Sequence, residues 1–270
     1  MALPQPSQSA TALVTGASAG IGDAIARELA SRGHGVTLVA RREERLRTLA
    51  SELSERHGVR ADAIAVDLGD PAARERLVDQ IAGMGLEVEI LVNNAGFGGS
   101  GNVADSDPER LIAMVRVNCE ALLDFQARYL PAMVGRGRGV VINIASTAAF
   151  QPIPGTATYA ATKAFVNTFS ESLRGELKRA GVHVTVLAPG PVRETLPAEH
   201  EQSLVERMIP DFLWISTEYT AKLSLDALER NKMRVVPGVT SKAMSVASGY
   251  APRAIVSPIV GAVYKKLGGD

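Results

Sequence analysis

This chain has a single cysteine and a formal net charge of zero. Its 270 residues include one cysteine, Cys119, which excludes an intramolecular disulfide and a zinc site built from several thiolates. One thiol fits a reducing compartment, and residues 1–10 lack the basic and apolar segments of a secretory signal, so we expect a cytoplasmic protein. The 29 Lys and Arg residues balance the 29 Asp and Glu residues, which argues against a nucleic-acid partner held by net charge.

Long hydrophobic runs are also missing. The longest uncharged region, 139–162, is interrupted by polar side chains and by Pro152 and Pro154, so we expect no membrane span. The apolar segment 254–267 near the C-terminus carries Lys265 and Lys266. We interpret it as a helix packed on the domain or on a neighbouring subunit, with a membrane-surface role as the alternative.

What the sequence does contain is a regular alternation of short apolar runs and helix-length amphipathic stretches. This alternation is typical of βαβ units, which right-handed crossovers join into a doubly wound sheet. We therefore predict a single-domain α/β Rossmann fold over 1–270, with a mostly parallel seven-stranded sheet and helices on both faces. The expected strands are 11–15, 35–40, 61–66, 90–93, 139–145, 182–188 and 233–237. The expected helices are 20–31, 43–57, 71–82, 108–134, 159–179 and 217–230.

Two regions break this rhythm. Residues 191–214 contain no expected strand and follow the sixth strand, so we interpret them as a substrate lid beyond the carboxyl ends of the strands. The apolar side of this lid, with Leu204, Met208 and Trp214, favours a hydrophobic carbonyl or alcohol substrate, although these side chains could equally pack the lid onto the sheet. Residues 238–270 form a C-terminal tail extension.

A glycine-rich turn joins the first strand to the first helix. Gly16, Gly20 and Gly22 stand in TGASAGIG at 15–22, between an expected strand and an expected helix. Glycines let the backbone turn sharply and approach a pyrophosphate, whose charge the helix N-terminus favours. The alternative is a turn needed only for tight packing of strand and helix.

The second strand ends in Arg41 and Arg42, where an NAD-specific domain usually offers a carboxylate to the ribose. Two guanidiniums suit a phosphate instead, because each binds two oxygens at once. The sequence therefore favours NADP, unless these arginines only begin the charged helix that follows.

Polar residues close the third and fourth strands. Asp67 follows the third strand and could accept a hydrogen bond from an adenine amino group, or cap the helix that begins near Pro71. Asn93 and Asn94 follow the fourth strand and could bond neighbouring strand ends beside a cofactor, or be purely structural.

A possible reaction centre lies further along the chain. Tyr159 and Lys163 are one helical turn apart, so both project from one face, and Ser146 ends the fifth strand. Carbonyl reduction needs a proton donor, and a phenol of pKa about 10 is a poor one unless a nearby cation stabilises the phenolate. Lys163 can be that cation, although a Tyr and a Lys at this spacing are more often surface neighbours.

Together these pieces resemble the main subfamily of the short-chain dehydrogenase/reductase family. The matching segments are TGASAGIG at 15–22, NNAG at 93–96, Asn118, Ser146, YAATK at 159–163 and PGPV at 189–192. The resemblance implies that Tyr159 is the catalytic acid-base and that Ser146 orients the substrate. It also implies that Lys163 binds the nicotinamide ribose and lowers the pKa of Tyr159, while Asn118 holds a water in the proton relay.

The resemblance also implies a cofactor site without a metal, because the cofactor carries the hydride. The expected cofactor-binding residues are Gly16, Ser18, Ala19, Gly20, Ile21, Gly22, Arg41, Arg42, Asp67, Leu68, Asn94, Ala95, Gly96, Tyr159, Lys163, Pro189, Gly190, Val192 and Thr195. One position departs from the family: a Thr that often contacts the carboxamide is replaced by Glu194. Thr195 either restores that contact or caps the next segment.

The resulting expectation is an NADPH-dependent oxidoreductase that reduces a ketone or aldehyde reversibly. The enzymatic alternative is a 3-oxoacyl-thioester (ketoacyl) reductase, whose basic entrance could include Arg136 and Arg138. An alternative of another class is a dinucleotide-binding sensor or scaffold without turnover, which the intact Ser146, Tyr159 and Lys163 disfavour. The resemblance further implies a homodimer or homotetramer assembled through the long helices.

Overall fold

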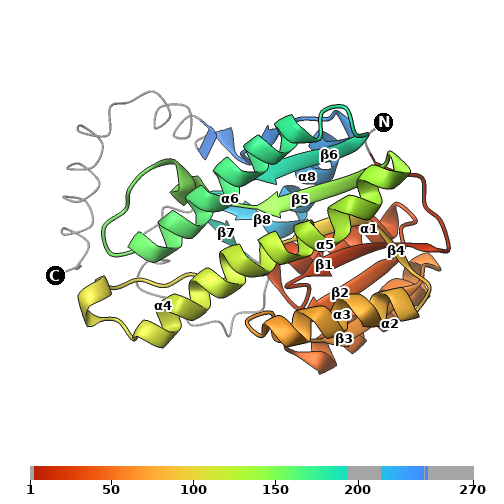
Figure 1. Cartoon of the computed structure of the whole chain (residues 1–270), viewed down its shortest axis with the longest axis horizontal. Helices are drawn as coiled ribbons and strands as arrows, with labels where there is room; N and C mark the ends of the chain where they lie inside the picture. The colour runs from red at the N-terminus through yellow and green to blue at the C-terminus, as the bar shows by residue number, and fades with distance from the viewer. Residues whose placement is uncertain (1–2, 194–213, 240, 243–270) are drawn as a thin grey trace.

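A parallel sheet of seven strands forms the centre of the molecule. The structure is a computed structural model that describes residues 3–193, 214–239, 241 and 242 (Figure 1). The strand order is β3-β2-β1-β4-β5-β6-β9, and every neighbouring pair is parallel, which confirms the predicted doubly wound fold. The strands are β1 (Ala10–Thr15), β2 (Val36–Ala40), β3 (Ala61–Ala65), β4 (Glu87–Asn93), β5 (Gly139–Ile144), β6 (Val182–Leu187) and β9 (Arg234–Val235).

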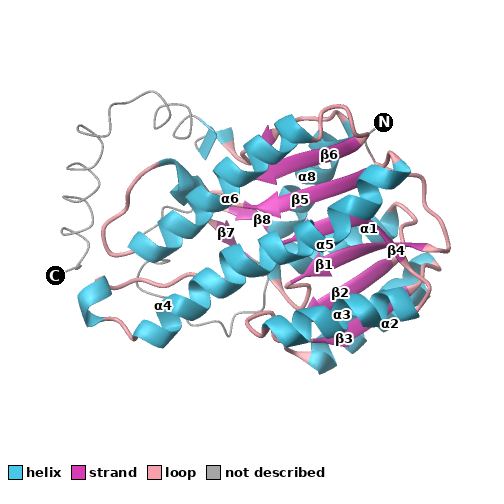
Figure 2. Ribbon diagram, viewed as in Figure 1, coloured by secondary structure: helices cyan, strands magenta, loops and turns pink. Residues whose placement is uncertain are grey.

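Helices cover both faces of this sheet. One face packs against α1 (Gly20–Ser31), α2 (Glu43–His57) and α8 (Thr217–Glu229). The other packs against α3 (Pro71–Gly83), α5 (Ala121–Arg136) and α6 (Ala157–Glu176), the three helices nearer the viewer in Figure 2. Along β1, Ala12 and Val14 enter the first core and Leu13 enters the second. Because both faces are covered, the central strands are mostly apolar, as the sequence indicated.

The sheet order reverses at β1, whose neighbours are β2 on one side and β4 on the other. In open α/β sheets a ligand crevice forms at this reversal, outside the carboxyl ends of the strands. The fold therefore places the glycine-rich turn after β1 and the residues after β4 at one site.

The helix expected at 108–134 is interrupted. It consists of α4 (Pro108–Val115), a π-helical turn, η2 (Arg116–Glu120), and α5, which continues to Arg136. A π turn inserts one extra residue into the helix, and such turns are frequent at functional sites. Asn118 lies within this turn and is 2% exposed.

Several other boundaries differ from the expected ones. β4 begins at Glu87, three residues early, because charged Glu87 and Glu89 hide its apolar pattern. α6 spans Ala157–Glu176 instead of 159–179. The region 191–214 was expected to lack a strand, which is wrong: β7 (Val192–Arg193) pairs with β8 (Ile215–Ser216).

Much of the expected lid and tail lies outside the described residues, as does Thr195. Two short 3₁₀ helices, η1 (Val103–Asp105) and η3 (Thr147–Phe150), complete the described elements. Among the helices of residues 3–193 and 214–239, none is both long and apolar enough to cross a membrane.

Candidate active site

The turn after β1 is packed too tightly for side chains at two of its glycines. Gly16 has φ of 68°, a conformation that favours glycine. A Cβ on Gly22 would lie 2.4 Å from Nδ2 of Asn94 and 2.4 Å from the carbonyl oxygen of Gly16. An added Cβ would therefore clash with the backbone of the turn and with the amide of Asn94, which hydrogen bonds hold in place. The glycine spacing is a steric requirement of this turn.

Asn94 and Thr15 tie the ends of β1 and β4 together. Nδ2 of Asn94 donates to the carbonyls of Thr15 and Gly16 at 2.9 and 3.2 Å. Oγ1 of Thr15 accepts from the backbone N–H groups of Asn94 and Ala95, both at 3.0 Å. Asn93 instead bonds Asn143 on β5 inside the core. The asparagine pair therefore has a structural role, and Asn94 also borders the site.

One cavity of about 340 Å³ occupies the side of the site nearer β2 and β3. It is lined by Gly16, Ser18, Ala40, Arg41, Arg42, Val66, Asp67, Leu68, Ala95, Gly96, Phe97 and Val117. We call it the adenine half, after the role expected for Asp67. Phe97 and Val117 were missed by the sequence reasoning, although Phe97 directly follows NNAG.

Two side chains of this half are fixed by hydrogen bonds. Nη2 of Arg42 donates to Oγ of Ser18 at 2.9 Å, so the arginine bridges the glycine-rich turn and the start of α2. Oδ1 of Asp67 accepts from the N–H of Gly69 at 2.9 Å. The N-cap of α3 is Asp70, which excludes the alternative that Asp67 caps this helix.

A second cavity of about 310 Å³ lies beside β5 and α6. It is lined by Gly16, Ala19, Ile21, Asn94, Ala95, Gly96, Ile144, Ala145, Ser146, Tyr159, Lys163, Pro189, Gly190 and Val192. The two cavities share Gly16, Ala95 and Gly96, so they join into one groove across the sheet reversal. We call the second cavity the nicotinamide half.

The expected catalytic side chains meet in the nicotinamide half. Nζ of Lys163 donates to the carbonyl of Ile144 at 2.8 Å and lies 5.8 Å from the ring centroid of Tyr159. Burial lowers the pKa of Lys163 to about 8. Burial also raises the pKa of Tyr159, and a hydrogen bond with Ser146 partly opposes this rise. The net direction is opposite to the lowering of the Tyr159 pKa expected from Lys163.

Asn118 holds the loop that follows Gly96. Its Oδ1 accepts from the N–H of Phe97, and its Nδ2 donates to the carbonyl of Phe97, both at 3.0 Å. The second Nδ2 hydrogen goes to Oγ1 of Thr162 at 3.0 Å. These bonds occupy both hydrogens of the side-chain amide, so Asn118 joins the loop after Gly96 to α6.

Two of the expected cofactor-binding glycines and both expected entrance arginines lie outside the groove. Gly22 is packed beneath the glycine-rich turn, and Gly20 lines a separate cavity of about 450 Å³ among α1, α2 and α8. Arg136 donates to the carbonyl of Val88, and Arg138 pairs with Glu89. These arginines flank the start of β5, at the end of the sheet opposite the groove. They cannot form a basic entrance to it, so that expectation is wrong.

Metal-ligating side chains do not gather in the part of the chain that the structure describes. No group of three or more His, Cys, Asp or Glu residues there could hold a metal ion. Cys119 is only partly exposed, and burial raises the pKa of its thiol to about 11.

The chain is similar in sequence to known dehydrogenases and reductases. A sequence model described as short chain dehydrogenase matches residues 10–204. The chain is 40% identical over 191 residues to the very-long-chain 3-oxoacyl-CoA reductase of Anas platyrhynchos, covering 68% of this chain and 60% of that protein. The chain thus spans about three fifths of that relative's length. It is 39% identical over 184 residues to an NADP-dependent 3-hydroxy acid dehydrogenase of Salmonella typhi, covering 68% and 73% of the two chains.

A solved structure agrees with these matches. The short-chain dehydrogenase from Sphingobium yanoikuyae in complex with NADPH has a TM-score of 0.77 and 30% sequence identity, with 92% of this chain and 94% of that chain covered. The family match spans more than half of the chain, and the fold is the same doubly wound sheet. The chain therefore belongs to the short-chain dehydrogenase family.

Proposed function

We propose that this protein is an NADPH-dependent carbonyl reductase that also runs in reverse as an alcohol dehydrogenase. The observation that carries the proposal is the meeting of Ser146, Tyr159 and Lys163 in one of two adjoining cavities along the carboxyl edge of the sheet. The groove also fits a pyrophosphate, because the N-cap of α1 is Ala19, whose methyl side chain cannot accept a hydrogen bond from the first N–H groups of the helix.

The side chains support a proton transfer from Tyr159. A bound nicotinamide would supply the hydride to the carbonyl carbon. The Tyr159 hydroxyl is protonated at neutral pH, since the ordinary pKa of a phenol is about 10 and burial raises it further. It can give its proton to the developing alkoxide oxygen where the nearby Lys163 ammonium stabilises the phenolate that remains. Ser146 hydrogen-bonds Tyr159 and can also hold the substrate oxygen. Lys163 stays fixed to Ile144 and supplies positive charge below a pH of about 8.

The adenine half supports NADPH over NADH. Arg41 and Arg42 line it where Ala40 offers no carboxylate to a ribose hydroxyl. Arg42 is already held by Ser18, so its guanidinium is positioned at the wall of the groove before any ligand binds. The Salmonella typhi relative is named as NADP-dependent, and the Sphingobium yanoikuyae structure contains NADPH.

A 3-oxoacyl thioester is the second candidate substrate. The name of the Anas platyrhynchos relative favours it. A Cβ on Gly98 would lie 3.4 Å from the ring of Tyr159, and a Cβ on the next residue, Gly99, would lie 3.8 Å from the guanidinium of Arg110. Arg110 therefore gives this side of the site a cation that could meet a phosphorylated carrier arm, in place of Arg136 and Arg138.

The decisive experiment measures NADPH oxidation with a panel of ketones, aldehydes and oxoacyl thioesters. Tyr159→Phe is compared with Tyr129→Phe, which also removes a buried hydroxyl, one with no hydrogen-bond partner. We expect turnover by the wild type and by Tyr129→Phe, and a loss of at least about a hundredfold in Tyr159→Phe. Tight NADPH binding with no turnover on any substrate would contradict the reductase and favour the sensor.

We also propose that the protein assembles as a homodimer or homotetramer. Apolar side chains on α4 and α5 are exposed in the single chain: Ile112, Val115, Leu123 and Val134, each 42–45%. Exposed apolar side chains on two successive helices favour an interface between subunits. Light scattering should give a multiple of the 28.5 kDa chain mass, and a monomer mass would refute the proposal.

A further inference from the structure

Arg74 on α3 is a buried cation directly behind the adenine half. Only 3% of its side chain is exposed, although arginine is rarely buried without partners. Three of its nitrogen atoms donate hydrogen bonds, each to a different residue and each at 2.8 Å or less. A guanidinium with this many fixed contacts holds its partners in a defined geometry.

The first contact reaches one wall of the adenine half. Nη1 of Arg74 donates to the carbonyl of Leu68 at 2.8 Å. Asp67 and Leu68 both line the cavity, in the connection between β3 and α3. The bond therefore fixes the backbone of the segment that would face an adenine ring.

The other contacts reach the opposing wall. Nη2 donates to Oε1 of Glu120 at 2.5 Å, and Nε donates to Oδ2 of Asp124 at 2.7 Å. Glu120 ends the π-helical turn in which Val117 lines the same cavity. The two walls adjoin, since a Cβ on Gly69 would lie 3.9 Å from Cγ2 of Val117.

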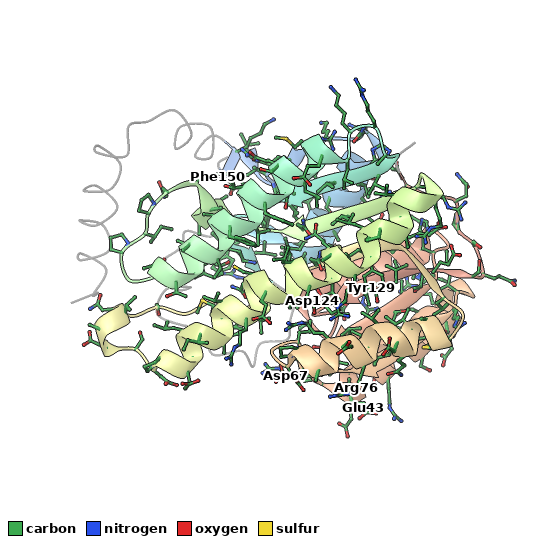
Figure 3. All side chains as sticks on the ribbon, viewed as in Figure 1. Glu43, Asp67, Arg76, Asp124, Tyr129 and Phe150 are labelled. Carbon is green, nitrogen blue, oxygen red and sulfur yellow. The ribbon has the colours of Figure 1, made fainter. Side chains whose placement is uncertain are left out.

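Only arginine can make this connection. Its planar fork presents five N–H donors in fixed directions, whereas lysine has a single nitrogen and cannot reach three separated acceptors with the same geometry. The two carboxylates also compensate the buried charge, which would otherwise carry a large desolvation cost. Figure 3 labels Asp124 on α5 and Arg76 on the neighbouring α3.

We propose that Arg74 is a positioning residue that joins the two walls of the adenine half and thereby sets the affinity for the adenosine part of the dinucleotide. The inference rests on the dinucleotide groove of the proposed function. Arg74 itself does not line the cavity. It acts through the carbonyl of Leu68 and through the π-helical turn that carries Val117.

The test compares binding of NADPH with binding of reduced nicotinamide mononucleotide, which lacks the adenosine part. Arg74→Met should weaken NADPH binding by about tenfold, a loss of about 1.4 kcal/mol, and leave mononucleotide binding within about twofold. Arg74→Lys should give a partial loss. The matched control is Arg76→Met on the same helix, because Arg76 is 69% exposed and forms a long ion pair with Asp70, at 3.6 Å. It should bind both ligands as the wild type does.

The outcomes separate this inference from the proposed function. Failure of the wild type to bind NADPH would refute the dinucleotide groove itself. If the wild type binds NADPH and folded Arg74→Met binds it equally well, or loses both ligands equally, the positioning role is refuted. Should Arg74→Met not fold, Glu120→Ala decides, because Glu120 is 46% exposed and its removal breaks one connection only. Unchanged NADPH affinity in that variant would refute the role as well.

Discussion

Lys163 donates to the carbonyl of Ile144, two residues before Ser146, and its nitrogen lies 5.8 Å from the centroid of the Tyr159 ring. The bond ties α6 to the end of β5, so one strand and one helix set the relative positions of Ser146, Tyr159 and Lys163. Because the ammonium group is buried, its pKa is lowered to about 8, close to the pH at which the enzyme would be assayed.

Carbonyl reduction should therefore lose rate in alkaline solution. Below a pH of about 8 Lys163 carries its charge, and Tyr159 keeps its proton, since the ordinary pKa of a phenol is about 10 and burial raises it further. We expect kcat at saturating NADPH to be level near neutral pH and to fall as the pH rises through about 8. Lys163→Met should lower kcat and remove this inflection. A wild-type profile that stays level through pH about 9 would contradict the assignment to Lys163.

Selectivity for NADPH should depend on Arg41. Its side chain is exposed at the adenine half, where an Asp would repel a ribose phosphate and accept a hydrogen bond from a ribose hydroxyl. Arg41→Asp should lower the ratio of NADPH to NADH affinity by at least about tenfold. Arg47→Met is the control, since Arg47 is 73% exposed and pairs with Glu43 on the same helix. An unchanged ratio in Arg41→Asp would show that the NADPH assignment is wrong.

The sheet could be predicted from the sequence because its strands are buried on both faces. Continuous apolar runs such as 36–40 and 139–144 have no polar alternation, which is typical of parallel strands. The position of the groove could be predicted as well, since the carboxyl ends of β1, β3, β4 and β5 meet on one edge of the sheet. The start of β4 was missed because Glu87 and Glu89 find partners in Arg136 and Arg138, contacts that only the folded chain shows.

Other features depend on three-dimensional detail. The π-helical turn around Asn118 adds one residue without changing the composition of the helix, so no periodicity signals it. Val117 and Phe97 reach the groove because of that turn and the loop that Asn118 holds. Arg74 lies in an ordinary polar stretch of α3, so the local sequence does not mark it as buried. Its burial depends on carboxylates that lie 46 and 50 residues away in the chain.

The glycine-rich turn should not tolerate a methyl group at Gly22. A Cβ there would lie 2.4 Å from both Nδ2 of Asn94 and the carbonyl oxygen of Gly16, and neither can move without breaking the turn. Gly22→Ala should lower the free energy of unfolding by about 1–3 kcal/mol or more and abolish NADPH binding. Gly135→Ala is the control, because Gly135 lies in α5 and a Cβ there would meet no described atom within 4 Å beyond its own stretch of helix. This variant should stabilise the protein by about 0.5–1 kcal/mol. If urea titrations give the two variants the same free energy of unfolding, this steric account is wrong.

The ion cluster on α5 should make stability sensitive to acid. Although burial works to raise the pKa of Asp124, hydrogen bonds from Arg74 and Arg128 lower it below its usual value. A carboxyl whose pKa is lower in the folded state stabilises the fold above its unfolded pKa of about 3.9, and this contribution is lost as the pH falls through the folded pKa. Asp124→Asn should therefore lower the free energy of unfolding at pH 7 by about 1–3 kcal/mol and flatten its decline in acid.

Glu43 supplies the matched control for this prediction. Glu43, labelled in Figure 3, pairs with Arg47 across one turn of α2. The two side chains are 54% and 73% exposed. An exposed pair contributes little, so Glu43→Gln should leave both the free energy of unfolding at pH 7 and its acid dependence close to those of the wild type. Urea titrations at a series of pH values compare the three proteins. If the curves of Asp124→Asn and the wild type stay parallel down to pH about 3, the carboxylate of Asp124 is not the group whose protonation weakens the fold.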